Sequence, residues 1–74
     1  MVNIRKLKVK LVEKDISIIQ LANILGIDRS TVYRKLNKSG ENFTVKDVEK
    51  IAKALSLTYD DINIIFFIQY FNKY

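Results

Sequence analysis

Arginine and hydroxyl side chains gather between residues 29 and 38, and they carry the most specific binding chemistry in the chain. An arginine can donate two hydrogen bonds to O6 and N7 of a guanine, and a serine or threonine can contact a base edge or the methyl group of a thymine. The segment holds four basic residues and no acidic one, whereas an ordinary solvated helix pairs both signs at helical spacing. The candidates for contact with base edges are Arg29, Ser30, Thr31 and Arg34.

A helix over this segment separates the outward candidates from the residues that must face a core. If Val32 and Leu36 face inward, one turn apart, then Ser30, Arg34 and Asn37 point outward. The residues at the flanks of this outward face are Thr31, Tyr33 and Lys38. The pattern favours binding to duplex DNA over an ordinary structural helix.

The chain lacks the residue types that most catalytic and metal sites use. It contains no histidine and no cysteine, so it has neither the usual general base nor a thiolate nucleophile or ligand. Neighbouring carboxylates at Asp60 and Asp61 could suggest a metal site, but they fall in a predicted first helical turn, where acidic side chains interact favourably with the helix dipole. We therefore expect no enzymatic activity, no cofactor and no bound metal.

The net charge of +5 is unevenly distributed. Residues 1–38 carry nine basic and three acidic residues, whereas residues 39–74 carry four and five. A basic half indicates either a face that meets a polyanion or a solubilising surface, and charge alone leaves both open. The basic residues of the first predicted helix suit a solvated face better than a DNA contact. There is no signal-peptide pattern, and the longest apolar run, Ile64–Ile68, is too short to cross a bilayer, so we expect an intracellular protein.

Four predicted helix starts share one pattern, in which an apolar residue precedes a capping residue and another apolar residue follows one turn later. The capping residues are Ser17, Asp28, Thr44 and Thr58. At the first of them, Gln20 can bond back to Ser17, which makes a capping box. Because the chain also has no proline and only two glycines, we expect an all-α bundle. The predicted helices cover residues 4–14, 18–25, 29–38, 45–55 and a segment that starts at 59.

The second and third predicted helices are joined as in a helix-turn-helix unit. Gly26 follows the second helix and can adopt the left-handed conformation that ends a helix. Ala22, one turn earlier, is small enough to let the two helices approach closely. This arrangement fits a motif whose second helix enters the major groove of DNA, and the alternative is an ordinary hairpin of helices inside a bundle.

Residues 16–66 resemble the Cro/repressor (Xre-type) helix-turn-helix domain of temperate phages and bacterial regulators, and in particular the small repressors of phages from low-GC Gram-positive hosts. The segments that carry the resemblance are Leu21-Ala22, Leu25-Gly26-Ile27-Asp28-Arg29-Ser30-Thr31-Val32-Tyr33-Arg34-Lys35-Leu36-Asn37, Phe43-Thr44, Ile51-Ala52-Lys53-Ala54-Leu55, Asp61-Ile62 and Ile65-Phe66-Phe67. The resemblance implies a five-helix lambda-repressor-like bundle that acts as a dimer on two-fold operators. It also implies a place in the cytoplasm of a bacterial cell or a phage-infected host.

The resemblance further implies roles for single positions. Arg29, Ser30 and Arg34 fall where the family contacts base edges, and Ser17 falls where it contacts phosphate. The remaining residues expected on the DNA backbone are Tyr33, Asn37, Lys38, Ser39 and Asn42. Of these, Tyr33 is equally suited to stacking on a sugar and to packing. Ile18 departs from the family, which often has a phosphate-binding glutamine there, so we expect any contact at this position to come from the backbone N–H.

Residues 64–74 carry more apolar surface than one small bundle can easily cover. This tail could complete the core of the monomer, pair as a short strand or form a partner surface. We favour an extended segment over a continued helix, and we divide the chain into a DNA-binding domain at residues 1–65 and a dimerisation tail at residues 66–74. The residues assigned to the dimer contact are Phe66, Phe67, Ile68, Tyr70 and Phe71.

The sequence therefore predicts a sequence-specific transcriptional regulator that binds double-stranded DNA, either Cro-like or a minimal repressor. We expect it to act as a homodimer on a palindromic operator. The alternative from another class is a protein-interaction module of the same fold, such as an antitoxin or an antirepressor. Strong, salt-dependent binding of duplex DNA favours the regulator, whereas a neutral or shielded face on the third helix favours the module.

Overall fold

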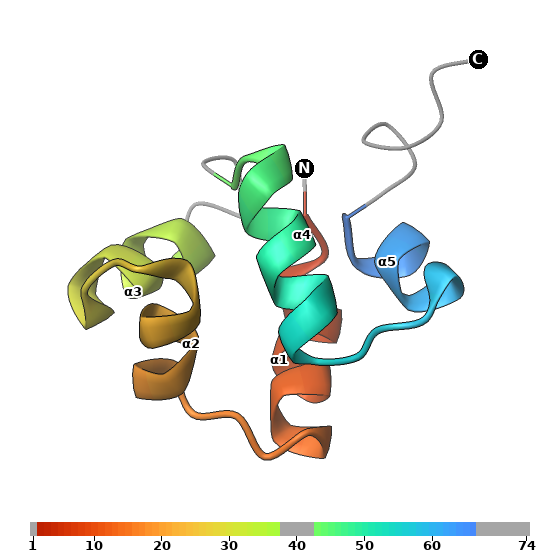
Figure 1. The fold of residues 1–74 in the computed structure, drawn as a ribbon, viewed down its shortest axis with the longest axis horizontal. Helices are drawn as coiled ribbons and strands as arrows, with labels where there is room; N and C mark the ends of the chain where they lie inside the picture. The colour runs from red at the N-terminus through yellow and green to blue at the C-terminus, as the bar shows by residue number, and fades with distance from the viewer. Residues whose placement is uncertain (1, 38–42, 67–74) are drawn as a thin grey trace.

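The computed structural model describes residues 2–37 and 43–66, which form five α-helices and no strand. The helices are α1 Ile4–Glu13, α2 Ile18–Leu25, α3 Arg29–Asn37, α4 Val45–Ala54 and α5 Tyr59–Phe66 (Figure 1). The predicted all-α bundle is confirmed. α1 and α4 each end one residue before their predicted ends, and Lys14 and Leu55 serve as their C-caps. None of these described helices is long and apolar enough to cross a membrane.

The helix starts are capped by short polar side chains, which satisfy backbone N–H groups that no helical carbonyl can reach. The Ser17 hydroxyl accepts from the Gln20 N–H at 3.1 Å, and the Gln20 Oε1 accepts from the Ser17 N–H at 2.8 Å. The same reciprocal box begins α4, through Thr44 and Asp47, and α5, through Thr58 and Asp61. Each box joins residues three apart, so these starts follow from local sequence alone.

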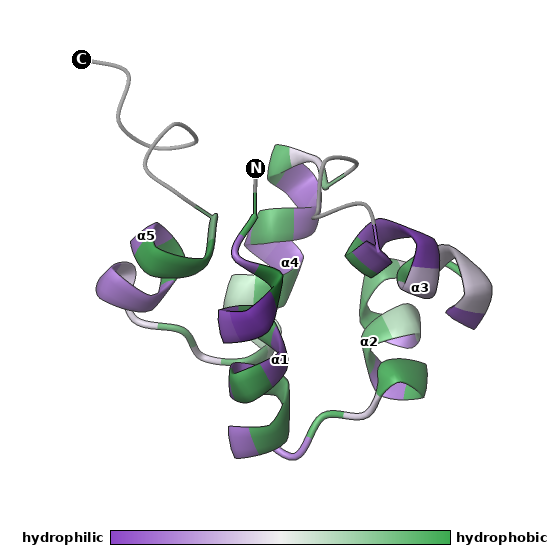
Figure 2. Cartoon of the chain, turned by 180° about the vertical axis from the view of Figure 1, so that it is seen from behind, coloured by the Kyte–Doolittle hydropathy of each residue, from purple (hydrophilic) through white to green (hydrophobic). Residues whose placement is uncertain are grey.

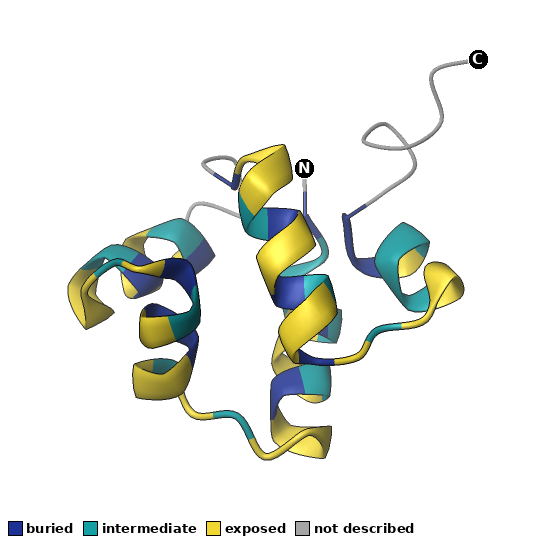
Figure 3. Cartoon of the chain, viewed as in Figure 1, coloured by how far each residue is buried: buried dark blue, intermediate teal, exposed yellow. Residues whose placement is uncertain are grey.

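The helices are arranged around a central pair. α1 and α4 lie in the middle, with α2 and α3 on one side and α5 on the other (Figures 1 and 2). α2 packs against both α3 and α4, and α1 packs against α5. The apolar sides of the helices meet in one core, where the dark blue segments of Figure 3 face inward. The largest fully buried side chains are Phe66, Leu7, Leu21, Ile51, Leu55, Ile65, Val32 and Val48.

α5 is tied to the start of α1 and carries part of the core. The Asn3 N–H donates to the Ile65 carbonyl at 2.7 Å, and the Lys10 ammonium lies 3.4 Å from the Asp61 carboxylate. Because α5 rests on α1, its last residues lie against the body of the bundle. Ile65 and Phe66 are both 0% exposed.

The burial of Phe66 corrects its assignment to a dimer surface. Its ring meets the ring of Phe43 edge to face, with centroids 6.4 Å apart, and pairs of this geometry add to the stabilisation from burial. The Phe66 side chain therefore belongs to the core of the monomer. The helical unit also extends one residue past the predicted boundary after residue 65. The other assigned dimer residues, between 67 and 71, and the proposed extended form of the tail lie outside the described residues.

Candidate nucleic-acid interface

A short turn closed by backbone hydrogen bonds joins α2 to α3. The Gly26 N–H donates to the Asn23 carbonyl at 3.2 Å, and the Ile27 N–H donates to the Ala22 carbonyl at 3.0 Å. Gly26 has φ of 73°, in the left-handed region, and a Cβ built there would meet no heavy atom within 4 Å, so backbone conformation is what favours glycine. Ala22 is buried beside the turn. These features form the helix-turn-helix that the sequence predicts.

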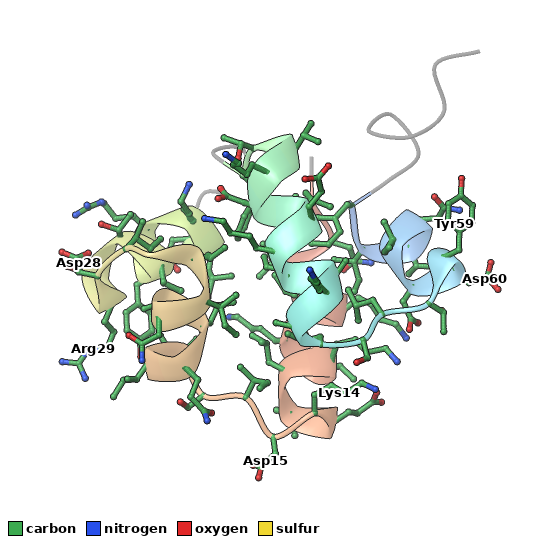
Figure 4. All side chains as sticks on the ribbon, in the orientation of Figure 1. Lys14, Asp15, Asp28, Arg29, Tyr59 and Asp60 are labelled. Carbon is green, nitrogen blue, oxygen red and sulfur yellow. The ribbon has the colours of Figure 1, made fainter. Side chains whose placement is uncertain are left out.

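α3 has one buried side and one open side. Val32 and Leu36 are buried in the core, as the helical spacing predicts. The exposed residues of α3 include Arg29, Ser30, Arg34 and Asn37. Figure 4 shows the Arg29 side chain projecting away from the bundle at the start of α3, on the opposite side of the molecule from α5. The structure thus places four of the predicted DNA contacts on one helix, open to a ligand.

Polar contacts connect the start of α3 with Arg34. The Thr31 N–H donates to the Asp28 Oδ1 at 2.8 Å, which caps the helix, and the Arg34 Nη2 donates to the Thr31 Oγ1 at 3.0 Å. The hydroxyl and the backbone N–H of Thr31 hold the pKa of Asp28 below its ordinary value, with smaller contributions from Ser30 and the Arg34 charge, against the effect of desolvation. Thr31 itself is half-buried, so it is less open to a ligand than its neighbours.

Lys35 differs from the other basic residues of α3 because it packs toward α4. Its ammonium lies 3.3 Å from the Asp47 carboxylate and 5.5 Å from the centre of the Phe43 ring. Its side chain is only 15% exposed. The same Asp47 oxygen accepts from the Thr44 N–H at 3.1 Å, so one carboxylate both caps α4 and holds α3. The charge of Lys35 thus serves the fold, a role that sequence spacing did not indicate.

Three of the predicted DNA-backbone contacts, Ser17, Tyr33 and Asn37, line one groove of about 380 Å³ between α1, α2 and α3. Its other lining residues are mostly apolar, and Tyr33 remains 49% exposed, so its ring packs on the groove and still presents a face to solvent. Lys8 of α1 also lines this groove. Sequence reasoning assigned it to a solvated face, and its place in the basic half of the chain was the only signal available.

The structure also describes two of the other positions that the sequence raised, Ile18 and Asp61. Ile18 is half-buried and packs against the core, and it lines the same groove as Tyr33 and Asn37. Asp61 accepts from the Thr58 N–H at 3.2 Å, and this hydrogen bond is the main cause of its lowered pKa. Asp61 also pairs with Lys10. Within residues 2–37 and 43–66, no three acidic side chains gather where they could hold a metal ion.

The predicted backbone contacts at Lys38, Ser39 and Asn42, and with them the predicted end of the third helix at residue 38, fall outside the described part of the chain. The arrangement that remains is an exposed, basic helix on a capped helix-turn-helix. A family model described as the Cro/C1-type HTH DNA-binding domain matches residues 6–67. No curated protein and no solved structure matches the chain.

Proposed function

The chain belongs to the Cro/C1-type HTH DNA-binding domain family, and from this premise we propose that it is a sequence-specific transcriptional regulator, Cro-like or a minimal repressor. The family is typically non-enzymatic and implies DNA binding. In the proposed complex, α3 lies in the major groove of double-stranded DNA, and the action of the protein is to occupy an operator rather than to transform a substrate.

The observation that carries this proposal is the open side of α3. It presents Arg29 and Arg34 to solvent, and α3 itself contains no acidic residue. The α4 side of the same helix is closed by the pair of Lys35 and Asp47. An α-helix fits the width of the major groove, and arginines are the side chains that most often contact guanine there. Charge and shape therefore favour the same ligand.

We assign the contacts in two groups. Arg29, Ser30 and Arg34 contact base edges, and Thr31 belongs to the same cluster through its hydrogen bond with Arg34. Ser17, Tyr33 and Asn37 contact the sugar-phosphate backbone along the groove between α1, α2 and α3, where we add Lys8 as a fourth contact. Lys38, Ser39 and Asn42 complete the set of backbone contacts. Phosphate contacts of this kind set affinity and register, whereas base contacts set specificity.

We further propose a homodimer on a palindromic operator. Two copies related by a two-fold axis would place two recognition helices about 34 Å apart, one turn of duplex. The contact is assigned to Phe67, Ile68, Tyr70 and Phe71, because Phe66 already belongs to the core. A chain truncated after Phe66 tests this by sedimentation and thermal unfolding. We expect the full chain to sediment as a dimer and the truncated chain as a folded monomer, whereas a full chain that sediments as a monomer contradicts the assignment.

Selection of bound duplexes from a random DNA pool tests the main proposal. We expect enrichment of one motif with two related half-sites. Binding of the selected duplex should then exceed binding of a scrambled duplex by about 10³-fold or more, the lower end of the range for specific regulators. A chain that enriches no motif and binds all duplexes weakly would contradict the regulator and favour the protein-interaction module.

A further inference from the structure

The base-contact candidates on α3 are not equivalent, because one of them is already engaged by another. The Arg34 Nη2 donates to the Thr31 Oγ1 at 3.0 Å, one helical turn away. Thr31 is half-buried, whereas Ser30 and Arg34 are exposed. A ligand that approaches the open side of α3 therefore meets the guanidinium of Arg34 more readily than the hydroxyl of Thr31.

Thr31 has polar contacts with both Arg34 and Asp28. A threonine hydroxyl has one hydrogen to donate and an oxygen that can accept. The oxygen accepts from Arg34 at 3.0 Å, and the hydroxyl is the first cause of the lowered pKa of Asp28. The Thr31 N–H donates to the same carboxylate at 2.8 Å, which holds Thr31 at the start of the helix. The result is a directed series of contacts from Arg34 through Thr31 to Asp28.

This series leaves Arg34 equipped for a base. A guanidinium has five N–H donors in a rigid plane, so a bond from Nη2 to Thr31 leaves donors for a bidentate contact with a guanine. An unrestrained arginine on a basic helix can turn instead to the nearest phosphate, which carries no sequence information. A held arginine enters the groove with less conformational freedom to lose, and such pre-organisation strengthens binding.

We propose that Thr31 is a positioning residue that orients Arg34 toward one base pair, with Asp28 anchoring Thr31, and that Thr31 does not itself contact a base. This inference rests on the proposed function, since it concerns the specificity of the same helix. It changes the assignment of Thr31 within the predicted base-contact set, and it assigns to Asp28 a role in specificity besides capping.

The test compares Thr31→Val, which removes the hydroxyl and keeps the shape, with Thr31→Ser, which keeps the hydroxyl. The probes are the duplex selected by the parent chain and variants of it with single substituted base pairs. Arg34→Ala first identifies the base pair that Arg34 contacts. We expect Thr31→Val to reduce discrimination at that same base pair by roughly tenfold, and Thr31→Ser to retain it. Urea unfolding of each variant checks that the fold persists.

A double variant separates positioning from direct contact. In the Arg34→Ala background, Thr31→Val should change discrimination by less than about twofold, because there is no longer a guanidinium to orient. The inference is overturned if Thr31→Val acts at a different base pair, or if it acts equally with and without Arg34. It is also overturned if Thr31→Ser fails to rescue. A parent chain that discriminates among no duplexes contradicts the proposed function itself, and this inference with it.

Discussion

Arg34 and Lys35 are neighbours in the chain, yet they have different surroundings on α3. Each lies beside a pair of a threonine and an aspartate that caps a helix, Thr31 with Asp28 and Thr44 with Asp47. Arg34 is exposed, whereas the Lys35 side chain is 15% exposed and lies over the Phe43 ring. Two basic side chains beside similar threonine–aspartate pairs therefore differ in exposure, because Lys35 packs against α4 and Arg34 does not.

The difference between Arg34 and Lys35 also explains how a short helix with several cations can be held in a fixed orientation. Removing one of its cations to an ion pair inside the fold lowers the repulsion among the others. The same pair joins α3 to the start of α4, so the open side has a fixed orientation. Surface pairs contribute little to stability, but a partly buried pair that also caps a helix contributes through both interactions.

The largest expected difference between the exposed side of α3 and the side packed on α4 is the effect of salt. Salt should weaken DNA binding by the exposed side strongly and should change the stability of the packed side little. If about four to eight phosphates are neutralised per dimer, log affinity should fall against log salt with a slope of roughly −4 to −7. This corresponds to a loss of about 10²- to 10⁴-fold between about 50 and 200 mM salt. The free energy of unfolding should change by less than about 1 kcal/mol over this range, because partly buried pairs are screened little. Fluorescence anisotropy and urea titration measure the two, and a flat affinity would favour the protein-interaction module.

Leu36→Ala should lower the stability of the fold and, with it, DNA binding, because Leu36 anchors α3 in the core. It is 5% exposed, and truncation of a buried leucine costs about 2–5 kcal/mol of unfolding free energy. Urea unfolding followed by circular dichroism measures the loss. The neighbouring Asn37→Ala is the control and should stay within about 0.5 kcal/mol, since Asn37 is exposed. Similar losses in both variants would contradict the orientation of α3.

Arg34→Ala should affect binding and leave the fold unchanged. We expect a loss of about 1–3 kcal/mol in specific binding and relaxed preference at one base pair per half-site. Titration of the selected duplex and its single-substitution variants measures both. Lys53→Ala, which removes an exposed cation near the end of α4, is the matched control for net charge. Equal weakening on every duplex would instead place Arg34 on phosphate.

Asp47→Ala should have the opposite effect to Arg34→Ala. It should lower the stability of the fold and leave the DNA specificity nearly unchanged. It removes both a helix cap and the ion partner of Lys35, which together should lower the free energy of unfolding by about 1–2 kcal/mol. The ratio of specific to non-specific affinity should stay within about twofold under conditions where the variant is folded. A variant of unchanged stability but relaxed base preference would show that the α4 side also controls specificity.

The smallest expected effect is a pH dependence at Asp28. Because its pKa is lower in the folded chain, mainly through the Thr31 hydroxyl, its contribution to stability is present above the ordinary carboxyl pKa of about 3.9. The contribution is lost as pH falls through the lowered value. Asp28→Asn keeps a capping side chain but removes the titration, so the parent should lose more stability than this variant on acidification below about pH 4. Parallel acid profiles for the two chains would contradict this assignment.

Much of the fold follows from interactions between residues three or four positions apart. Such interactions can be predicted from the sequence alone. The caps at Ser17, Thr44 and Thr58 join a side chain to a backbone group one turn later, so a short motif is enough to locate them. Gly26 ends α2 for an equally local reason, its positive φ. The spacing of Val32 and Leu36 orients α3 and thereby exposes Arg34, wherever the core lies.

Contacts between residues far apart in the chain depend on how the helices pack, and only the tertiary structure shows them. Lys35 pairs with Asp47, twelve positions later in the chain. The Phe66 ring, at the end of the described chain, packs against the Phe43 ring. The spacing of Ile62, Ile65 and Phe66 suits one face of a helix, but only the packing against Phe43 shows that this face is covered within the monomer. Lys8 likewise lies on the groove of Tyr33 and Asn37 only because the fold brings residues of α1, α2 and α3 to one groove. The helix positions and the exposed face of α3 are thus encoded locally, whereas the surroundings of Lys35, Phe66 and Lys8 are set by contacts between elements.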